Sequence, residues 1–202
     1  MPAFGGALAW LTLEVLRRHG ITATRLGIVP TRSPRPAGHL KSWQIAGYAV
    51  LACVFCARIA TMARSYLPMH SAPTSSSSTS RWEILPDAVY AVALEDLVIV
   101  AAVAALLTAA RRPQWEMYAI AGGPTVAVHL SYGVAALAFL PYALVRLGLY
   151  RRHGRLIPLI TAHAAVDVLG LWLLTLSAQH YLIGTYIENA LLLALALVLI
   201  TR

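Results

Sequence analysis

Apolar segments of about 20 residues recur along this chain, and they constrain its fold more than any other feature, because a helix of that length crosses the hydrocarbon core of a bilayer. The 202 residues are 59% hydrophobic and only 12% charged, with a mean hydropathy of +0.68. Soluble domains carry roughly twice that charged fraction. The apolar runs are continuous rather than alternating, which argues against a β-barrel. We therefore expect an all-α, polytopic transmembrane helical bundle that forms a single integral membrane domain over residues 1–202.

The apolar runs predict six or seven membrane spans. The first run is short and carries Glu14, so it either crosses or lies at the interface. A break is expected near Tyr132 and Gly133, which divides one long apolar region into two shorter helices. The predicted spans are residues 3–16, 43–67, 87–110, two helices within 118–150, 156–177 and 181–200.

The basic residues fall in alternate loops between these spans. They are Arg17, Arg18, Arg25, Arg32, Arg35 and Lys41, then Arg111 and Arg112, then Arg146, Arg151, Arg152 and Arg155, and finally Arg202. The opposite loops hold only Arg64 and Arg81. Cytoplasmic loops of membrane proteins are enriched in lysine and arginine. We therefore expect the arginine-rich loops and the C-terminus to be cytoplasmic, in a bacterial cytoplasmic membrane.

The distribution of basic residues also indicates which binding partners to expect. The formal net charge is +8, but topology explains the basic residues, so nucleic acid is not an expected partner. The lipid bilayer is one, together with a protein or peptide substrate. The serine-rich segment 68–80 has the composition of a flexible external loop.

Ionisable residues inside the apolar segments mark the candidate site, namely Glu95, Asp96, His129, His163 and Asp167. A charge at the bilayer centre costs roughly 2.5–3.5 kcal/mol on insertion scales, so such residues are functional by default. His163 and Asp167 are four residues apart and share a helix face. Glu95 and Asp96 are adjacent, about 100° apart on an α-helix, so only one is expected to point straight into the site.

Carboxylates and imidazoles that share one membrane layer suit hydrolysis, because a buried glutamate can act as a general base toward water. Alternatively, Glu95, His129, His163 and Asp167 could hold a divalent metal such as Zn²⁺ with an open position for water. A small proton-coupled transporter is a further alternative, since buried carboxylates also relay protons. Glu188 could line the same cavity or lie at the interface.

The residues also carry a family resemblance. The segment 148–167 resembles the last motif region of the CPBP intramembrane proteases, which include the CAAX prenyl endopeptidases and Abi-type bacterial membrane proteins. The matching residues are Gly148, Tyr150, Gly154, Pro158, His163 and Asp167. Upstream, Glu95 and Asp96 are similar to the EExxxR motif of this family, and His129 to its FxxxH motif. The spacings from Glu95 to His129 and from His129 to His163 are both 34 residues, and the resemblance covers a motif-bearing core of about 87–170.

The resemblance implies a CAAX-protease-like fold and an intramembrane endopeptidase that hydrolyses a membrane-delivered protein or peptide. Glu95 and His129 would then activate water, while His163 and Asp167 would stabilise the oxyanion, either without a metal or with a divalent ion. The chain departs from the family at four places, where Asp96 stands for Glu, Val100 for Arg, Thr125 for Phe, and Asp167 for the usual Asn. An ionised Asp167 would repel an oxyanion. A catalytically inactive membrane scaffold or immunity partner is therefore the alternative.

Overall fold

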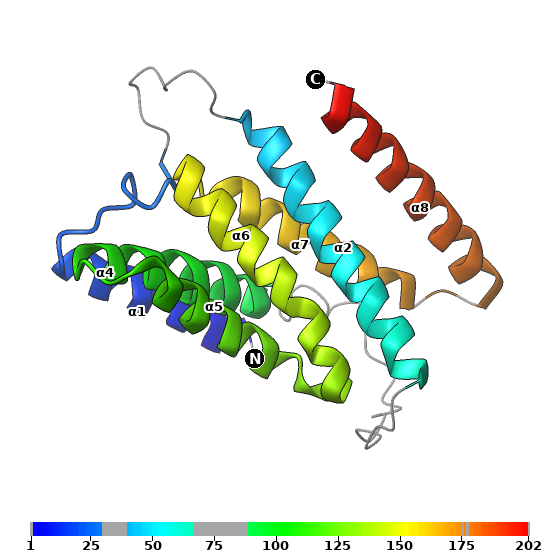
Figure 1. Cartoon of the computed structure of the whole chain (residues 1–202), viewed down its shortest axis with the longest axis horizontal. Coiled ribbons are helices and arrows are strands. Elements are labelled where there is room, and N and C mark those ends of the chain that lie inside the picture. Colours follow the sequence, from blue (N-terminus) through cyan, green and yellow to red (C-terminus); the bar gives the residue numbers. More distant parts are fainter. Residues whose placement is uncertain (1, 30–39, 67–88, 175, 177, 202) are drawn as a thin grey trace.

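The computed structural model describes residues 2–29, 40–66, 89–174, 176 and 178–201. Within those residues every regular element is a helix, which confirms the all-α class (Figure 1). The serine-rich segment 68–80 lies outside the described residues. In chain order the elements are α1 (Pro2–Arg18), α2 (Ser42–Tyr66), the π-helix η2 (Ala93–Ala102), α4 (Val103–Ala109), α5 (Gln114–Val128), the 3₁₀-helix η3 (Leu130–Phe139), α6 (Leu140–His153), α7 (Ile157–Leu174) and α8 (Ala178–Thr201).

Four of the described helical stretches are long and apolar enough to cross a membrane, namely Ser42–Ala63, Val89–Ala109, Leu130–His153 and Leu182–Thr201. The first, second and fourth coincide with predicted spans, and the third contains the later part of the predicted pair within 118–150. Within α7, the apolar stretch Ile157–Gly170 is shorter. By length and composition, the described residues thus contain four candidate spans of a helical membrane protein, and the predicted number of six or seven is not confirmed.

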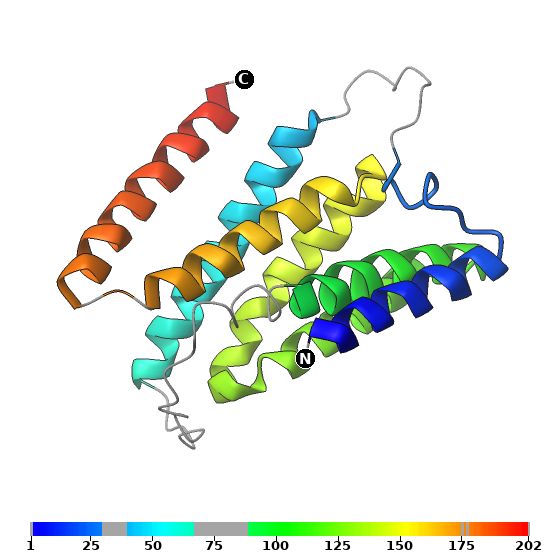
Figure 2. The same ribbon diagram turned by 180° about the vertical axis from the view of Figure 1, so that it is seen from behind.

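The helix α2 is central to the arrangement. It packs against η3, α6, α7 and α8, and it lies between α6 and α8 in both views (Figures 1 and 2). On the other side of the bundle, α1 packs along η2 (Figure 2). The helix α8 runs antiparallel to α2, because Leu195 and Leu199 near its end face Gly47 near the start of α2.

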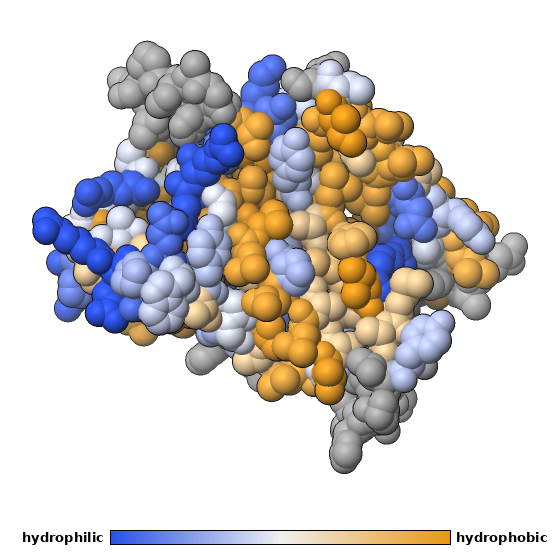
Figure 3. Space-filling view, viewed as in Figure 1, coloured by the Kyte–Doolittle hydropathy of each residue, from blue (hydrophilic) through white to orange (hydrophobic). Residues whose placement is uncertain are grey.

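The outer surface of the bundle is strongly apolar. Large hydrophobic side chains remain exposed on several helices, and they include Trp10, Phe55, Met62, Leu182, Leu191 and Leu197. Figure 3 shows apolar side chains over the faces of α2 and α8, while hydrophilic side chains gather toward the end of the molecule where α4 and α6 end. Exposed apolar surface on this scale marks contact with lipid or with another apolar partner.

That hydrophilic end unites loops that are far apart in the sequence. Arg25, Ala109, Arg151 and Gly154 line one shared surface cavity. Arg155 Nη1 also donates a hydrogen bond of 3.0 Å to Ser42 Oγ at the start of α2. The arginine-bearing loops therefore meet at one end of the bundle, as the alternation of basic residues predicts. The end of α8 lies at this end too, because α8 is antiparallel to α2.

The predicted break in the region 118–150 is confirmed. The helix α5 ends at Val128, and η3 follows directly. Gly133 then adopts φ 59° and ψ −138°, a conformation that is outside the helical region and that side chains rarely allow. The break separates α5 from α6.

A close contact between two loops gives the first prediction. Gly27 has φ +72°, and a Cβ there would collide with the carbonyl oxygen of Gly154 and lie 2.8 Å from Arg155 Cα. Gly20 has a similar φ of +73° but open space around it. We expect Gly20→Ala to cost about 1–2 kcal/mol from left-handed strain alone, and Gly27→Ala to cost clearly more.

The thermal unfolding midpoints of the two variants in detergent measure this difference, since the backbone strain is matched and only the steric environment differs. Equal midpoints would show that the contact between the two loops is not tight in the folded protein.

Candidate functional site

The π-helical geometry of η2 brings both predicted carboxylates to the same side. Glu95 is 6% exposed and Asp96 is fully buried, and both bond to the same arginine. The expectation that only one of them points into the site is therefore wrong. A π-helix closes its hydrogen bonds over five residues, so each turn is wider and successive side chains are separated by a smaller angle than in an α-helix.

Arg146 is the residue around which these groups assemble. It lies within α6 and is fully buried, so its assignment to a cytoplasmic loop is also wrong. Its Nη2 donates to Glu95 Oε2 at 3.2 Å, and its Nη1 donates to Asp96 Oδ1 at 3.2 Å. Longer contacts of 3.4 Å reach Thr125 Oγ1 and Tyr142 Oη. We call these residues, together with His163, the Arg146 cluster.

His163 enters the cluster from α7 and is held between two carboxylates. Its Nδ1 lies 2.8 Å from Asp96 Oδ2, so it donates a hydrogen bond to that oxygen. Its Nε2 lies 3.5 Å from Asp167 Oδ2. This second distance is longer than an ordinary hydrogen bond, so the contact with Asp167 is electrostatic. The Nε2–H of a protonated His163 therefore remains able to donate to another acceptor.

His129 lies at the end of α5, where the helix break places it. Its Nδ1 is 2.8 Å from the carbonyl oxygen of Thr125. Since a carbonyl only accepts, Nδ1 carries the proton, and Nε2 of the neutral ring is left as the acceptor. The ring stacks on Phe139 with a centroid distance of 3.8 Å, which fixes its orientation.

A cavity of about 460 Å³ lies beside the Arg146 cluster. It brings together three of the predicted residues, His129, His163 and Asp167. Glu95 and Asp96 are not among the lining residues and lie behind it, joined to it through Arg146 and His163. The remaining lining residues are Cys53, Val54, Ala57, Arg58, Thr61, Ala91, Tyr132, Phe139, Tyr142, Val166, Gly170, Leu173 and Glu188. We call this space the inner cavity.

The buried guanidinium of Arg146 is paired with two carboxylates. Burying a guanidinium in an apolar bundle is costly unless it is paired and hydrogen-bonded. Arg146 meets this condition with the carboxylates of Glu95 and Asp96, while its Nε has no hydrogen-bond partner among the described residues. The stability of the cluster therefore depends on the pairing, because removal of the guanidinium would leave both carboxylates buried and unpaired.

The four residues suggested above as a possible metal site do not converge on one point in this structure. Among the described residues, no group of three or more histidine, cysteine, aspartate or glutamate side chains is placed to hold a metal ion. Both ring nitrogens of His163 face carboxylates, and His129 directs Nδ1 at a backbone carbonyl. Glu95 is directed at Arg146 instead. The four residues named for a metal do not fit that role in this structure.

Two arginines that are important here, Arg146 and Arg58, were not among the site residues predicted from the sequence. Arg146 was grouped with the loop arginines that follow it, although it is seven residues before the end of α6. Arg58, in α2, forms an ion pair of 2.6 Å with Glu188 of α8, and both residues line the inner cavity. Their position within apolar runs was the available signal, because an intramembrane charge is expected to have a partner. Of the two alternatives for Glu188, the structure favours the cavity.

Val100 is fully buried in the apolar core of the bundle. The guanidinium beside Glu95 and Asp96 is that of Arg146, on α6. Comparisons of this chain with protein-family models, with curated proteins and with solved structures found no match in any of the three.

The buried ion pairs of the Arg146 cluster give a second prediction. Arg146→Met keeps an unbranched aliphatic stem but removes the guanidinium, which leaves Glu95 and Asp96 buried without the cation that pairs with them. We expect this substitution to lower the free energy of unfolding by roughly 3–5 kcal/mol, which is the usual effect of breaking a buried ion pair. Thermal unfolding in detergent measures it.

Two further variants test the cause. Adding Glu95→Gln and Asp96→Asn to Arg146→Met removes the unpaired charges and should recover part of the loss. Arg112→Met is the matched control, because Arg112 is exposed and pairs with Glu116 only at the surface. If Arg146→Met unfolds at the same temperature as Arg112→Met, Arg146 does not hold the cluster together.

Proposed function

We propose that this chain is an intramembrane endopeptidase of the CPBP type, with six or seven spans and a cytoplasmic C-terminus in a bacterial membrane. The observation that supports this most directly is the inner cavity, where His129, His163 and Asp167 meet beside the buried carboxylates. A cavity with convergent polar groups in an otherwise apolar bundle is the usual place of binding or catalysis. The order of the residues also agrees with the family pattern.

The geometry supports a division of roles. His129 presents Nε2 as a proton acceptor, so it can take a proton from a water molecule in the inner cavity as that water attacks a peptide carbonyl. Glu95 is the second member of this pair in our proposal, and it acts from behind the inner cavity, which it does not line. Its Oε2 is bound by Arg146, and its Oε1 is the oxygen that remains to orient water. The proton held by His129 then passes to the amine as the C–N bond breaks.

In this proposal His163 stabilises the negative charge that develops on the substrate. Its Nε2–H can donate to the oxyanion that forms on the carbonyl oxygen, because its contact with Asp167 is long. Asp96 touches no substrate in this scheme, since it is fully buried and bonds Nδ1 of His163 and the guanidinium of Arg146. It is a positioning residue that orients the imidazole, much as a buried carboxylate orients a catalytic histidine in other hydrolases.

A catalytically inactive scaffold is the second candidate, and one observation favours it. The carboxylate expected to activate water is bound by Arg146, and its neighbour Asp96 is bound by both Arg146 and His163. These pairs would serve equally well to hold helices together in the absence of a reaction.

The two candidates predict opposite results for His129. Endopeptidase function predicts that His129→Ala and Glu95→Gln each reduce cleavage by about 10²–10⁴-fold, the usual contribution of a general base. Mass spectrometry of new peptide N-termini, in membranes from cells expressing each form, measures cleavage. His19→Ala is the control, because His19 follows α1 and does not line the inner cavity.

Folding has to be checked in the same samples, by unfolding temperature and expression level. Termini that disappear with folded His129→Ala but persist with His19→Ala support the endopeptidase. Identical new N-termini from the wild-type protein and from folded His129→Ala would contradict the proposed endopeptidase activity. The scaffold would gain support if the biological phenotype of the protein also survived this variant but was lost with Arg146→Met.

A further inference from the structure

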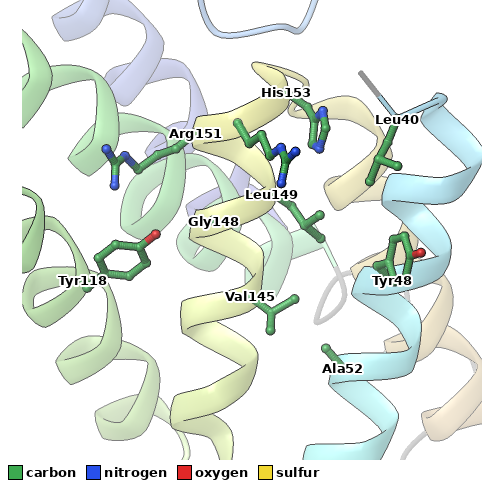
Figure 4. A pocket seen from close by; sticks show the side chains of 10 residues that line it. Leu40, Tyr48, Ala52, Tyr118, Val145, Gly148, Leu149, Arg151 and His153 are labelled. Atoms are coloured by element: carbon green, nitrogen blue, oxygen red, sulfur yellow. The ribbon is translucent and has the colours of Figure 1, made fainter. Parts of the chain in front are cut away.

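A second and larger cavity lies between α2, α5 and α6. It measures about 920 Å³ and is lined from three helices, with α6 as its floor and Tyr48 and Ala52 of α2 on one wall. Tyr118 of α5 forms the other wall, as Figure 4 shows. It shares no lining residue with the inner cavity. We call it the basic groove.

One end of the basic groove carries only positive charge. Arg151, Arg152 and His153 line it at the last turn of α6, and none of its ten lining residues is acidic. Arg151 is held in place, since its guanidinium lies 5.6 Å from the ring centre of Tyr118 and its Nη1 donates to Gln114 at 3.3 Å. Arg152 is exposed, and within the described part of the chain it makes no hydrogen bond or ion pair.

The other end of the basic groove is apolar. Val145 and Ala52 line it, and Figure 4 shows both at the end away from His153. Gly148 adds no side chain to the floor, and a Cβ there would meet only the hydroxyl of Tyr118, at 3.7 Å. The absence of a side chain at this position therefore keeps the groove open.

Two tyrosines lie between the basic and apolar ends. Tyrosine rings are enriched where a membrane protein meets the head-group layer, because one end of the ring is apolar and the other is polar. The basic end of the groove also coincides with the end of the bundle where the arginine-rich loops meet. The groove is therefore placed to receive a head group at that end and an acyl chain below it.

We propose that the basic groove binds an anionic phospholipid, with the phosphate at Arg151 and Arg152 and an acyl chain along Val145 and Gly148. Charge complementarity selects this occupant, since basic pockets between membrane helices at the cytoplasmic side bind anionic head groups. A peptide segment would leave its backbone groups without partners along the apolar end. The proposal is independent of the proposed endopeptidase activity, because it concerns a different cavity and needs no cleavage.

The test uses the purified full chain in a nonionic detergent, with phosphatidylglycerol or phosphatidylcholine added as the probe. Native mass spectrometry counts the lipid molecules that each form retains. We expect the wild-type chain to retain phosphatidylglycerol in preference to phosphatidylcholine. Arg152→Gln should reduce phosphatidylglycerol retention about fivefold, from the loss of one basic contact to an anionic lipid. Arg111→Gln is the control, because it removes the same charge from a neighbouring loop outside the groove.

A second variant tests the apolar end. Gly148→Leu fills the floor of the groove while both arginines remain, so retention of both lipids should fall. Gly123→Leu is its control, because Gly123 lies in the middle of α5 with open space around it. Either of two results would overturn the proposal. One is equal retention of the two lipids by the wild-type chain. The other is an equal loss in each variant and its control, which would show only nonspecific attraction to a basic surface.

Discussion

The pairing of Arg146 with two carboxylates is the interaction on which the centre of this bundle depends. An apolar bundle in a bilayer gains little from burying one apolar helix face against another, since lipid is equally apolar. Polar contacts between helices therefore have a large share in fixing their register. Arg146 of α6 bonds η2 through Glu95 and Asp96. Asp96 in turn bonds α7 through His163, so three helices are joined at one depth.

The same interaction determines what the carboxylates can do. Asp96 is bound at both oxygens, by Arg146 and by His163, which leaves it to orient other groups rather than to react. Glu95 is bound at one oxygen by the guanidinium. The proton acceptor with the freer geometry is His129, whose tautomer is set by a backbone carbonyl.

Much of this arrangement could be predicted from the sequence. The apolar runs predicted α2, α8 and the segment with Glu95 and Asp96, because a run of that length has few other stable states in a bilayer. Gly133 located the break between α5 and α6, since few residues tolerate its backbone conformation. The i, i+4 spacing correctly predicted that His163 and Asp167 lie together. These signals are local, and each is carried by a single element.

The remaining features depend on contacts between elements, which is why the sequence did not indicate them. The π-helical turn at Glu95 and Asp96 has no clear sequence signature, yet it decides that both side chains reach Arg146. Arg146 itself stands five residues before Arg151 and resembles the start of a loop cluster, whereas helical periodicity directs it inward and the neighbouring Val145 toward the basic groove. Neighbouring residues of α6, about 100° apart on the helix, thus contribute to two different sites.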